Sequence, residues 1–327
     1  MKDDAVAPVI AVMLILAAIV TFLSIWNAVY VPSMKQSAEV GHLQNVESAF
    51  LHFSSDIERA ASTRQDDLSL SEPVQLGGGD FFFNTLRSSG SLSVENEQKS
   101  IYYLTLYDGT GMVVGELDGT LVNISYEPQG NFWQDQGYRW QYGYVNVTKY
   151  RTLQSPLKQY NMTNVNNEFR DTGSLAAFAG SFGGVEYTVN QTLLQNTTPT
   201  SDNRFTFSPR TGNCSSIVLS AVNLSTSPDH QFVSSNGFGT LELKSNVITV
   251  PYYGVQKITI GSGREPFGNA TFRNWNSSFS ALAGTCENNI LYHPESSGDD
   301  FSLYTVEQQV NPVNVTINVV NIEVGVY

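Results

Sequence analysis

The sequence contains few of the residues from which catalytic and metal-binding sites are built. It has two cysteines and four histidines among 327 residues. Cys214 and Cys286 are too far apart for a C-x-x-C metal or redox motif. The chain has no G-x-S-x-G motif, and the three glycines at 77–79 lack the Lys-Ser/Thr that follows a phosphate loop. We therefore expect no enzyme activity, no metal site and no cofactor.

Positive charge is also scarce. The chain has 17 Lys and Arg residues against 30 Asp and Glu residues, which gives a net charge of -13 and excludes nucleic acid as the expected partner. A low charged fraction with many Asn, Ser, Thr, Gly and Tyr residues is typical of extracellular β-rich domains. In an oxidising exterior Cys214 and Cys286 could form one disulfide; the alternative is two separate buried thiols.

What the chain does contain is a long apolar stretch, Val6 to Val31. No charged residue lies between Asp4 and Lys35. At about 1.5 Å per residue, a helix of about 26 residues reaches about 39 Å, enough to cross a bilayer. A secretory signal has a shorter apolar run of about 7 to 15 residues behind a basic segment, so ordinary signal cleavage is disfavoured. The stretch is therefore predicted to be a permanent anchor, or a helix that leaves the bilayer for another apolar environment.

The residues around this boundary resemble the N-terminus of archaeal type IV pilins. Lys2-Asp3-Asp4-Ala5 followed by Val6-Ala7-Pro8-Val9-Ile10-Ala11 is similar to that family's class III signal peptide, a short charged leader before V-S-P-V-I-G. Ala7 and Ala11 replace the usual Ser and Gly. Ile10 stands where bacterial pilins and archaeal flagellins carry Glu, which places the resemblance with archaeal pilins. The resemblance implies that a prepilin peptidase removes residues 1–5 by cutting between Ala5 and Val6, and that the helix is kept.

The helix is predicted to continue to residue 62 with a kink or short break near Pro32, because proline lacks the backbone donor and clashes with the preceding turn. Beyond Pro32 the pattern is amphipathic. His42 and His52 are expected to lie on the helix surface. The predicted apolar face consists of Val40, Leu43, Val46, Phe50, Phe53, Ile57 and Ala60.

Residues 63–90 are predicted to be a linker and residues 91–327 an extracellular β-rich domain, so the fold class is α+β with a large antiparallel, sandwich-like ectodomain. Asp108-Gly109 and Asp118-Gly119 each predict a hairpin, giving a three-stranded meander. In the final segment, the apolar alternation changes phase near Val319-Val320, which predicts a β-bulge or a strand that passes between sheets. The remaining predicted strands are Tyr138 to Tyr150, Val185 to Asn190, Arg204 to Phe207, Ser216 to Asn223, Gly239 to Leu243, Val247 to Tyr253 and Val255 to Ile260.

Ten N-x-Ser/Thr sequons follow the helix. They indicate an exported glycoprotein, although many sequons arise by chance in an Asn-, Ser- and Thr-rich chain. Asn314, within the last predicted strand, is the least favoured for modification. The nine candidates for glycosylation are Asn123, Asn146, Asn161, Asn190, Asn196, Asn213, Asn223, Asn269 and Asn276.

The resemblance implies a structural subunit, major or minor, of an archaeal pilus-like filament at the cell surface, with a role in adhesion. Its expected partners are copies of itself or other pilins through the helix, the membrane before assembly, the prepilin peptidase and glycans. The alternative is a single-pass anchored ectodomain that binds carbohydrate or a cell-envelope partner. Aromatic residues between Trp133 and Tyr144 are candidates for a sugar platform, although aromatic residues in a β-domain more often fill the core.

Overall fold

A computed structural model describes residues 6–77, 88–98, 100–129, 135–149, 152–154, 183–190, 213–262, 267–286, 290–297, 300–308 and 313–327. The leader, residues 1–5, and the strand predicted over Arg204 to Phe207 lie outside the described residues.

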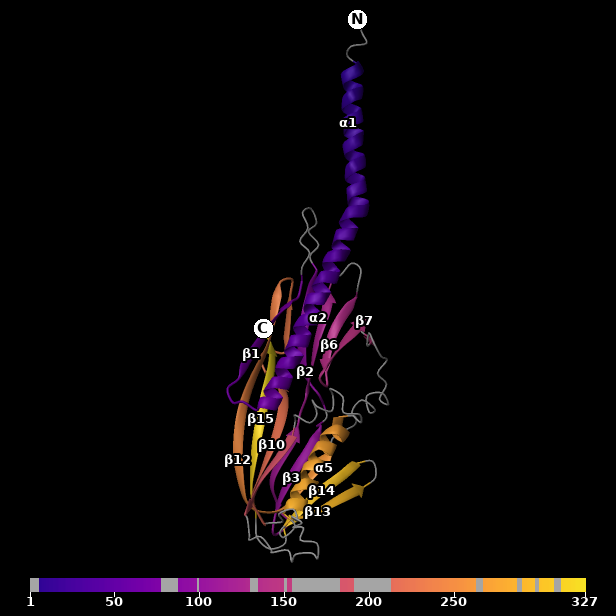
Figure 1. The fold of residues 1–327 in the computed structure, drawn as a ribbon. Helices are drawn as coiled ribbons and strands as arrows, with labels where there is room; N and C mark the ends of the chain where they lie inside the picture. Colours follow the sequence, from indigo (N-terminus) through magenta and orange to yellow (C-terminus); the bar gives the residue numbers. More distant parts are fainter. Residues whose placement is uncertain are drawn as a thin grey trace, which may run out of the picture.

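Residues 6–63 form one long helix, and its N-terminal part projects from a β-rich domain (Figure 1). It consists of α1 (Val6–Ile25), a π-helical turn η1 (Trp26–Tyr30) and α2 (Val31–Thr63). The helix continues through Pro32, so of the two predicted outcomes, a kink or a short break, the break does not occur. The wider η1 turn, in which the Val31 N–H donates to the Trp26 carbonyl, precedes the proline, and the axis bends there (Figure 1).

The strands form two sheets, here called sheet A and sheet B. Among the described strand pairs, all are antiparallel except β10 with β15, which are parallel. The predicted α+β class is confirmed, and the predicted antiparallel pairing is found everywhere except in this one pair. The nine strands of sheet A are β1 (Ser69–Gln75), β3 (Tyr102–Asp108), β4 (Val113–Gly119), β9 (Gly183–Asn190), β10 (Asn213–Thr226), β12 (Phe238–Ser262), β13 (Ile290–Ser297), β14 (Asp300–Gln308) and β15 (Val313–Val326). The six strands of sheet B are β2 (Ser89–Asn96), β5 (Val122–Gln129), β6 (Gln136–Gln141), β7 (Tyr144–Lys149), β8 (Thr152–Gln154) and β11 (Phe232–Ser235).

Two hydrophobic cores form on these sheets. The larger core joins the inner face of α2 to strands of both sheets, and it contains Leu43, Val46, Phe50, Phe53, Ile57 and Ala60 of the predicted apolar face. Val40 is exposed because it lies before the point where α2 enters the domain. The smaller core lies between sheet A and the second helix of the domain, α5 (Phe267–Thr285).

The phase change in β15 has a different cause from the one predicted. Val315 and Ile317 belong to the core under α5, whereas Val320 and Ile322 belong to the core under α2. Since successive residues point to opposite faces of a strand, the strand buries one face first and the other face afterwards. Its register with β12 is unbroken from Leu241 to Tyr252, so the predicted bulge or change of sheet near Val319-Val320 is wrong.

Two further predictions about β connections need correction. The Asp108-Gly109 turn does join a hairpin, β3 to β4. The Asp118-Gly119 turn does not, because β4 pairs with β3 in sheet A while β5 pairs in sheet B, so the chain crosses between sheets there. Gly119 is needed because a Cβ at this position would overlap the Tyr102 ring.

Residues 63–90 are only partly a linker. They include β1, which pairs along its whole length with the start of β12, and Val74 and Leu76 are buried in the larger core.

Beyond the bulge after Tyr252, β12 continues through Gly254, whose positive φ of 74° favours glycine. The three strands predicted between Gly239 and Ile260 are therefore one strand.

Candidate membrane and assembly helix

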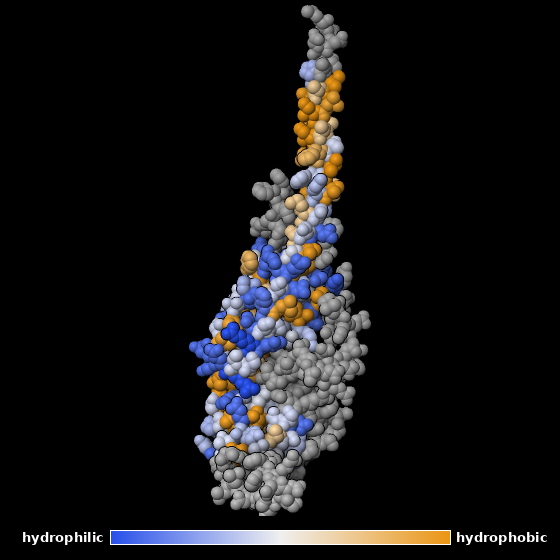
Figure 2. All heavy atoms as spheres, in the orientation of Figure 1, coloured by the Kyte–Doolittle hydropathy of each residue, from blue (hydrophilic) through white to orange (hydrophobic). Residues whose placement is uncertain are grey.

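The most unusual surface of the protein is α1, which lies outside the domain with its apolar side chains uncovered (Figure 2). Among the described residues, this is the one helix with the length and composition to cross a membrane. Large apolar residues are exposed all round it, from Val9 to Tyr30. A soluble domain does not leave such a surface in water, so the helix needs lipid or another apolar partner.

The apolar helix ends in an aromatic cluster. Phe22, Trp26 and Tyr30 follow one another at steps of four residues, and the ring centroids of Trp26 and Tyr30 are 5.2 Å apart. Both rings are exposed. Amphipathic rings favour the boundary between lipid and water, which puts that boundary at the η1 turn when α1 is in a bilayer.

The helix enters the domain at His42. Its Nε2 lies 3.0 Å from the Tyr126 hydroxyl, which in turn donates to the Leu76 carbonyl. Because that hydroxyl has one proton and donates it to Leu76, Nε2 donates its own proton to the hydroxyl oxygen. Burial lowers the pKa of His42, against weaker opposite effects of Gln75 and Glu39.

The prediction that His42 is on the helix surface is therefore wrong. His42 precedes Val46 and Phe50 at steps of four, so the periodicity that located the apolar face also places His42 on it.

Polar contacts fix α2 against β6 of sheet B. The Trp140 indole N–H donates to the Ser54 hydroxyl over 2.9 Å, and the Tyr138 hydroxyl donates to Glu47 over 3.3 Å. Both aromatic residues are buried in the larger core. They are therefore not available as the proposed sugar platform; Trp133 lies outside the described residues.

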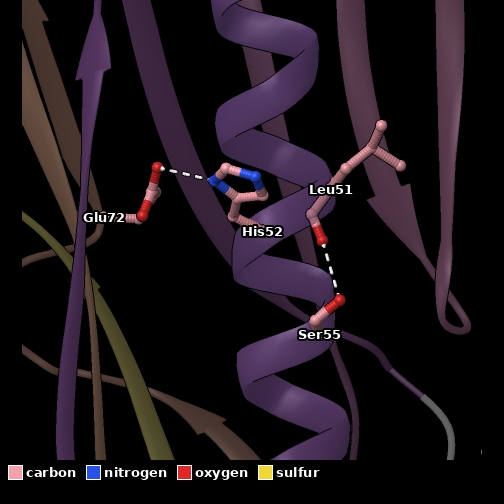
Figure 3. Close-up of polar contacts among 4 residues, drawn as sticks. All are labelled: Leu51, His52, Ser55 and Glu72. Carbon is pink, nitrogen blue, oxygen red and sulfur yellow. Dashed lines mark hydrogen bonds and ion pairs between the residues drawn. The ribbon is translucent and has the colours of Figure 1, made fainter.

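The opposite side of α2 faces solvent. Figure 3 shows Leu51, His52 and Ser55 on this side, with His52 Nδ1 3.5 Å from a carboxylate oxygen of Glu72 in β1. The His52 side chain is exposed, as predicted. An exposed ion pair of this kind contributes little to stability.

The smaller core contains the two cysteines. Cys214 at the start of β10 and Cys286 just after α5 form a disulfide, with Cα atoms 5.5 Å apart. The bond ties the C-terminal end of α5 to sheet A across 72 residues of chain. Among the described residues no other cysteine exists and no group of His, Cys, Asp and Glu side chains is placed to hold a metal ion.

The sequons differ in accessibility. Asn123 and Asn146 are each only 8% exposed, which leaves no room for a glycan on the folded domain, and these two candidates are withdrawn. Asn223 is half-buried, and Asn276 accepts a hydrogen bond from the Tyr292 hydroxyl. Asn314, the least favoured from sequence, is exposed.

Seven candidates stay predictions, Asn223 and Asn276 among them. Asn161 and Asn196 lie outside the described residues, as do the side chains of Asn190, Asn213 and Asn269 in β9, β10 and α5.

Comparison of the chain with protein families, with curated proteins and with solved structures gives no match.

Proposed function

We propose that this protein is a structural subunit of an archaeal type IV pilus-like extracellular filament with a role in adhesion. The observation that supports this most is the uncovered apolar helix α1, continuous with a helix that is itself part of the domain core. The short charged leader before Val6 supports processing by a prepilin peptidase between Ala5 and Val6.

The exposed apolar surface of α1 has to be covered, and two environments can cover it. Fifteen large apolar side chains from Val9 to Tyr30 are exposed. At about 1.5 kcal/mol for each such side chain that becomes buried, covering them is worth on the order of 20 kcal/mol. Lipid covers them before assembly, and the helices of neighbouring subunits cover them in the filament. Transfer between these two apolar environments is driven by side-chain packing, because water is excluded in both.

The rigid connection favours a filament over a simple anchor. Helical hydrogen bonding continues from α1 through η1 into α2, and one face of α2 packs against strands of both sheets. The domain therefore keeps a restricted direction relative to α1, as a repeating lattice requires. A protein that only needs to be tethered has no need of this restriction.

The proposal places the β-rich domain outside the cell, as a sandwich of sheets A and B around α2 that carries surface glycans at the accessible sequons. Its partners are copies of this chain or other pilins, and nucleic acid is not among them. The domain is large for a repeating subunit, so a minor or tip subunit is as compatible with the proposal as a major one. The competing proposal is an anchored ectodomain that never polymerises.

Mass spectrometry of the N-terminal peptide of the protein from native cells tests the processing step. We expect the mature chain to begin at Val6 and to retain α1. A mature chain that begins at Met1 would remove the main support for the filament and favour the anchored ectodomain.

A further inference from the structure

The face of sheet A opposite α5 is only half covered. Leu104 and Leu106 of β3 and Ile258 and Ile260 of β12 point into the core under α5. Because side chains alternate along a strand, the residues between them point to the other face, beyond the part of sheet A that α2 covers. This second face of β3 and β12 is the open face discussed below.

Three tyrosines, two of them exposed, lie in a row along the open face. Tyr103 and Tyr107 are four residues apart on β3, which separates them by about 13 Å. Tyr107 pairs with Lys257, and Tyr253 precedes Lys257 by four residues on β12. Register shifts after Tyr252 and after Val255 lie within this stretch of β12, so the row is shorter than eight residues of regular strand, which would span about 26 Å. Tyr253 is 73% exposed and Tyr103 is 43% exposed, whereas Tyr107 is half-buried.

Hydrogen-bonding groups lie between the rings. Thr105, between Tyr103 and Tyr107, is half-buried, whereas the hydroxyl of its cross-strand partner Thr259 is buried and does not reach the surface. The Lys257 ammonium lies 5.5 Å from the centroid of the Tyr107 ring, which restrains the ring and leaves a donor at its edge. Tyrosine rings separated by neutral hydroxyls fit a polymer whose units present apolar C–H faces and hydroxyl edges.

The charges beside the row select against an anionic polymer. Glu116 and Asp118 of β4 pair with Thr105 and Tyr103 and are exposed. These two carboxylates, with the net charge of -13, repel anions and accept hydrogen bonds from hydroxyl groups. Figure 1 shows β3 toward the end of the domain remote from α1, away from a membrane or filament core that holds α1.

We propose that the open face binds a neutral polysaccharide chain that lies along β3 and β12, with its sugar rings stacked on Tyr103, Tyr107 and Tyr253. This inference gives the proposed adhesion a ligand class, and it depends on the filament proposal only for placing the domain outside the cell. The alternation of Tyr103, Thr105 and Tyr107 with leucines is visible in the sequence, but which face of the strand stays uncovered depends on the assembled fold.

The test is a sedimentation binding assay with insoluble cellulose, chitin and starch. The full chain is used in an uncharged detergent without a sugar headgroup, since a sugar detergent would compete. We expect the wild-type protein to bind at least one of the three polymers. Each single change to alanine at the three tyrosines should weaken that binding by about 2- to 10-fold, from the contribution of one aromatic contact. Tyr253→Phe, which keeps the ring, should retain most of the binding.

Phe238→Ala is the matched control, because Phe238 is 71% exposed and lies at the opposite end of β12. It should bind as the wild type does, and circular dichroism should show that every variant is folded. No binding to any of the three polymers would overturn the inference, as would equal loss in the Phe238→Ala control. Filament formation by the same tyrosine variants separates polysaccharide binding from filament assembly. Variants that lose filaments but still bind polysaccharide would show that the open face is a subunit contact, which would refute the inference.

Discussion

Phe50 and Leu51 are neighbours in the sequence but lie on opposite sides of α2, and replacing each by alanine tests whether α2 is part of the domain core. Phe50 is buried in the larger core with its ring centroid 6.3 Å from that of Tyr138. Truncating a buried phenylalanine removes its burial energy and leaves a cavity, which costs about 3–5 kcal/mol. Leu51 is 50% exposed on the solvent side (Figure 3), so Leu51→Ala should cost less than about 1 kcal/mol.

The measurement is urea unfolding of the full chain in detergent, followed by near-ultraviolet circular dichroism of the buried aromatic residues. Phe50→Ala should lower the midpoint with little change in slope, and Leu51→Ala should leave it close to the wild-type value. Similar effects of the two changes would refute the packing of α2 against both sheets. The domain would then be held by its strands alone, and the rigid connection to α1 would lose its basis.

Three further changes probe other parts of the account. Burial lowers the pKa of His42, so the folded state favours the neutral ring. The free energy of unfolding should therefore be highest above about pH 6.5 and should fall as the pH is lowered toward about 5.5. His42→Gln should reduce this pH dependence, and an unchanged dependence in the variant would contradict the role of His42. Gly183→Ala should destabilise the domain by about 1–3 kcal/mol, because a Cβ at this position overlaps the Trp275 ring. Gly41→Ala should stabilise it by about 0.5–1 kcal/mol, because Gly41 lies in α2 with open space around it. Equal effects of the two changes on the unfolding midpoint would count against the close approach of Gly183 to Trp275. Reduction of the Cys214–Cys286 disulfide, which closes a long loop, should lower the free energy of unfolding by about 2–4 kcal/mol, and no change under a thiol reductant would show that the bond does not stabilise the domain.

The features predicted correctly from sequence are those fixed by local periodicity. The apolar face of α2 follows from steps of three and four residues, and the β3–β4 hairpin follows from Asp108-Gly109. The parallel pair of β10 with β15 could not be predicted in the same way, because it joins segments about a hundred residues apart. The phase change in β15 was visible in the sequence, but its cause depends on α2 and α5 covering opposite faces of one sheet, which is a property of the assembled fold.

The features of the candidate site also fall into those visible in the sequence and those that depend on packing. The apolar helix and its aromatic end at Trp26 and Tyr30 follow from composition alone. The burial of Asn123 and Asn146, and the core positions of Tyr138 and Trp140, follow from how sheet B packs. Sequons and aromatic residues therefore identify candidates, and packing decides which of them are accessible.

Electron cryo-microscopy of filaments sheared from native cells and shown by mass spectrometry to contain this protein tests the central claim most directly. We expect helices spanning residues 6–30 of neighbouring subunits to pack against one another along the filament axis, with the β-rich domains outside. Recovery of the protein only as single chains in the membrane fraction, with filaments that lack it, would contradict the claim and leave an anchored ectodomain.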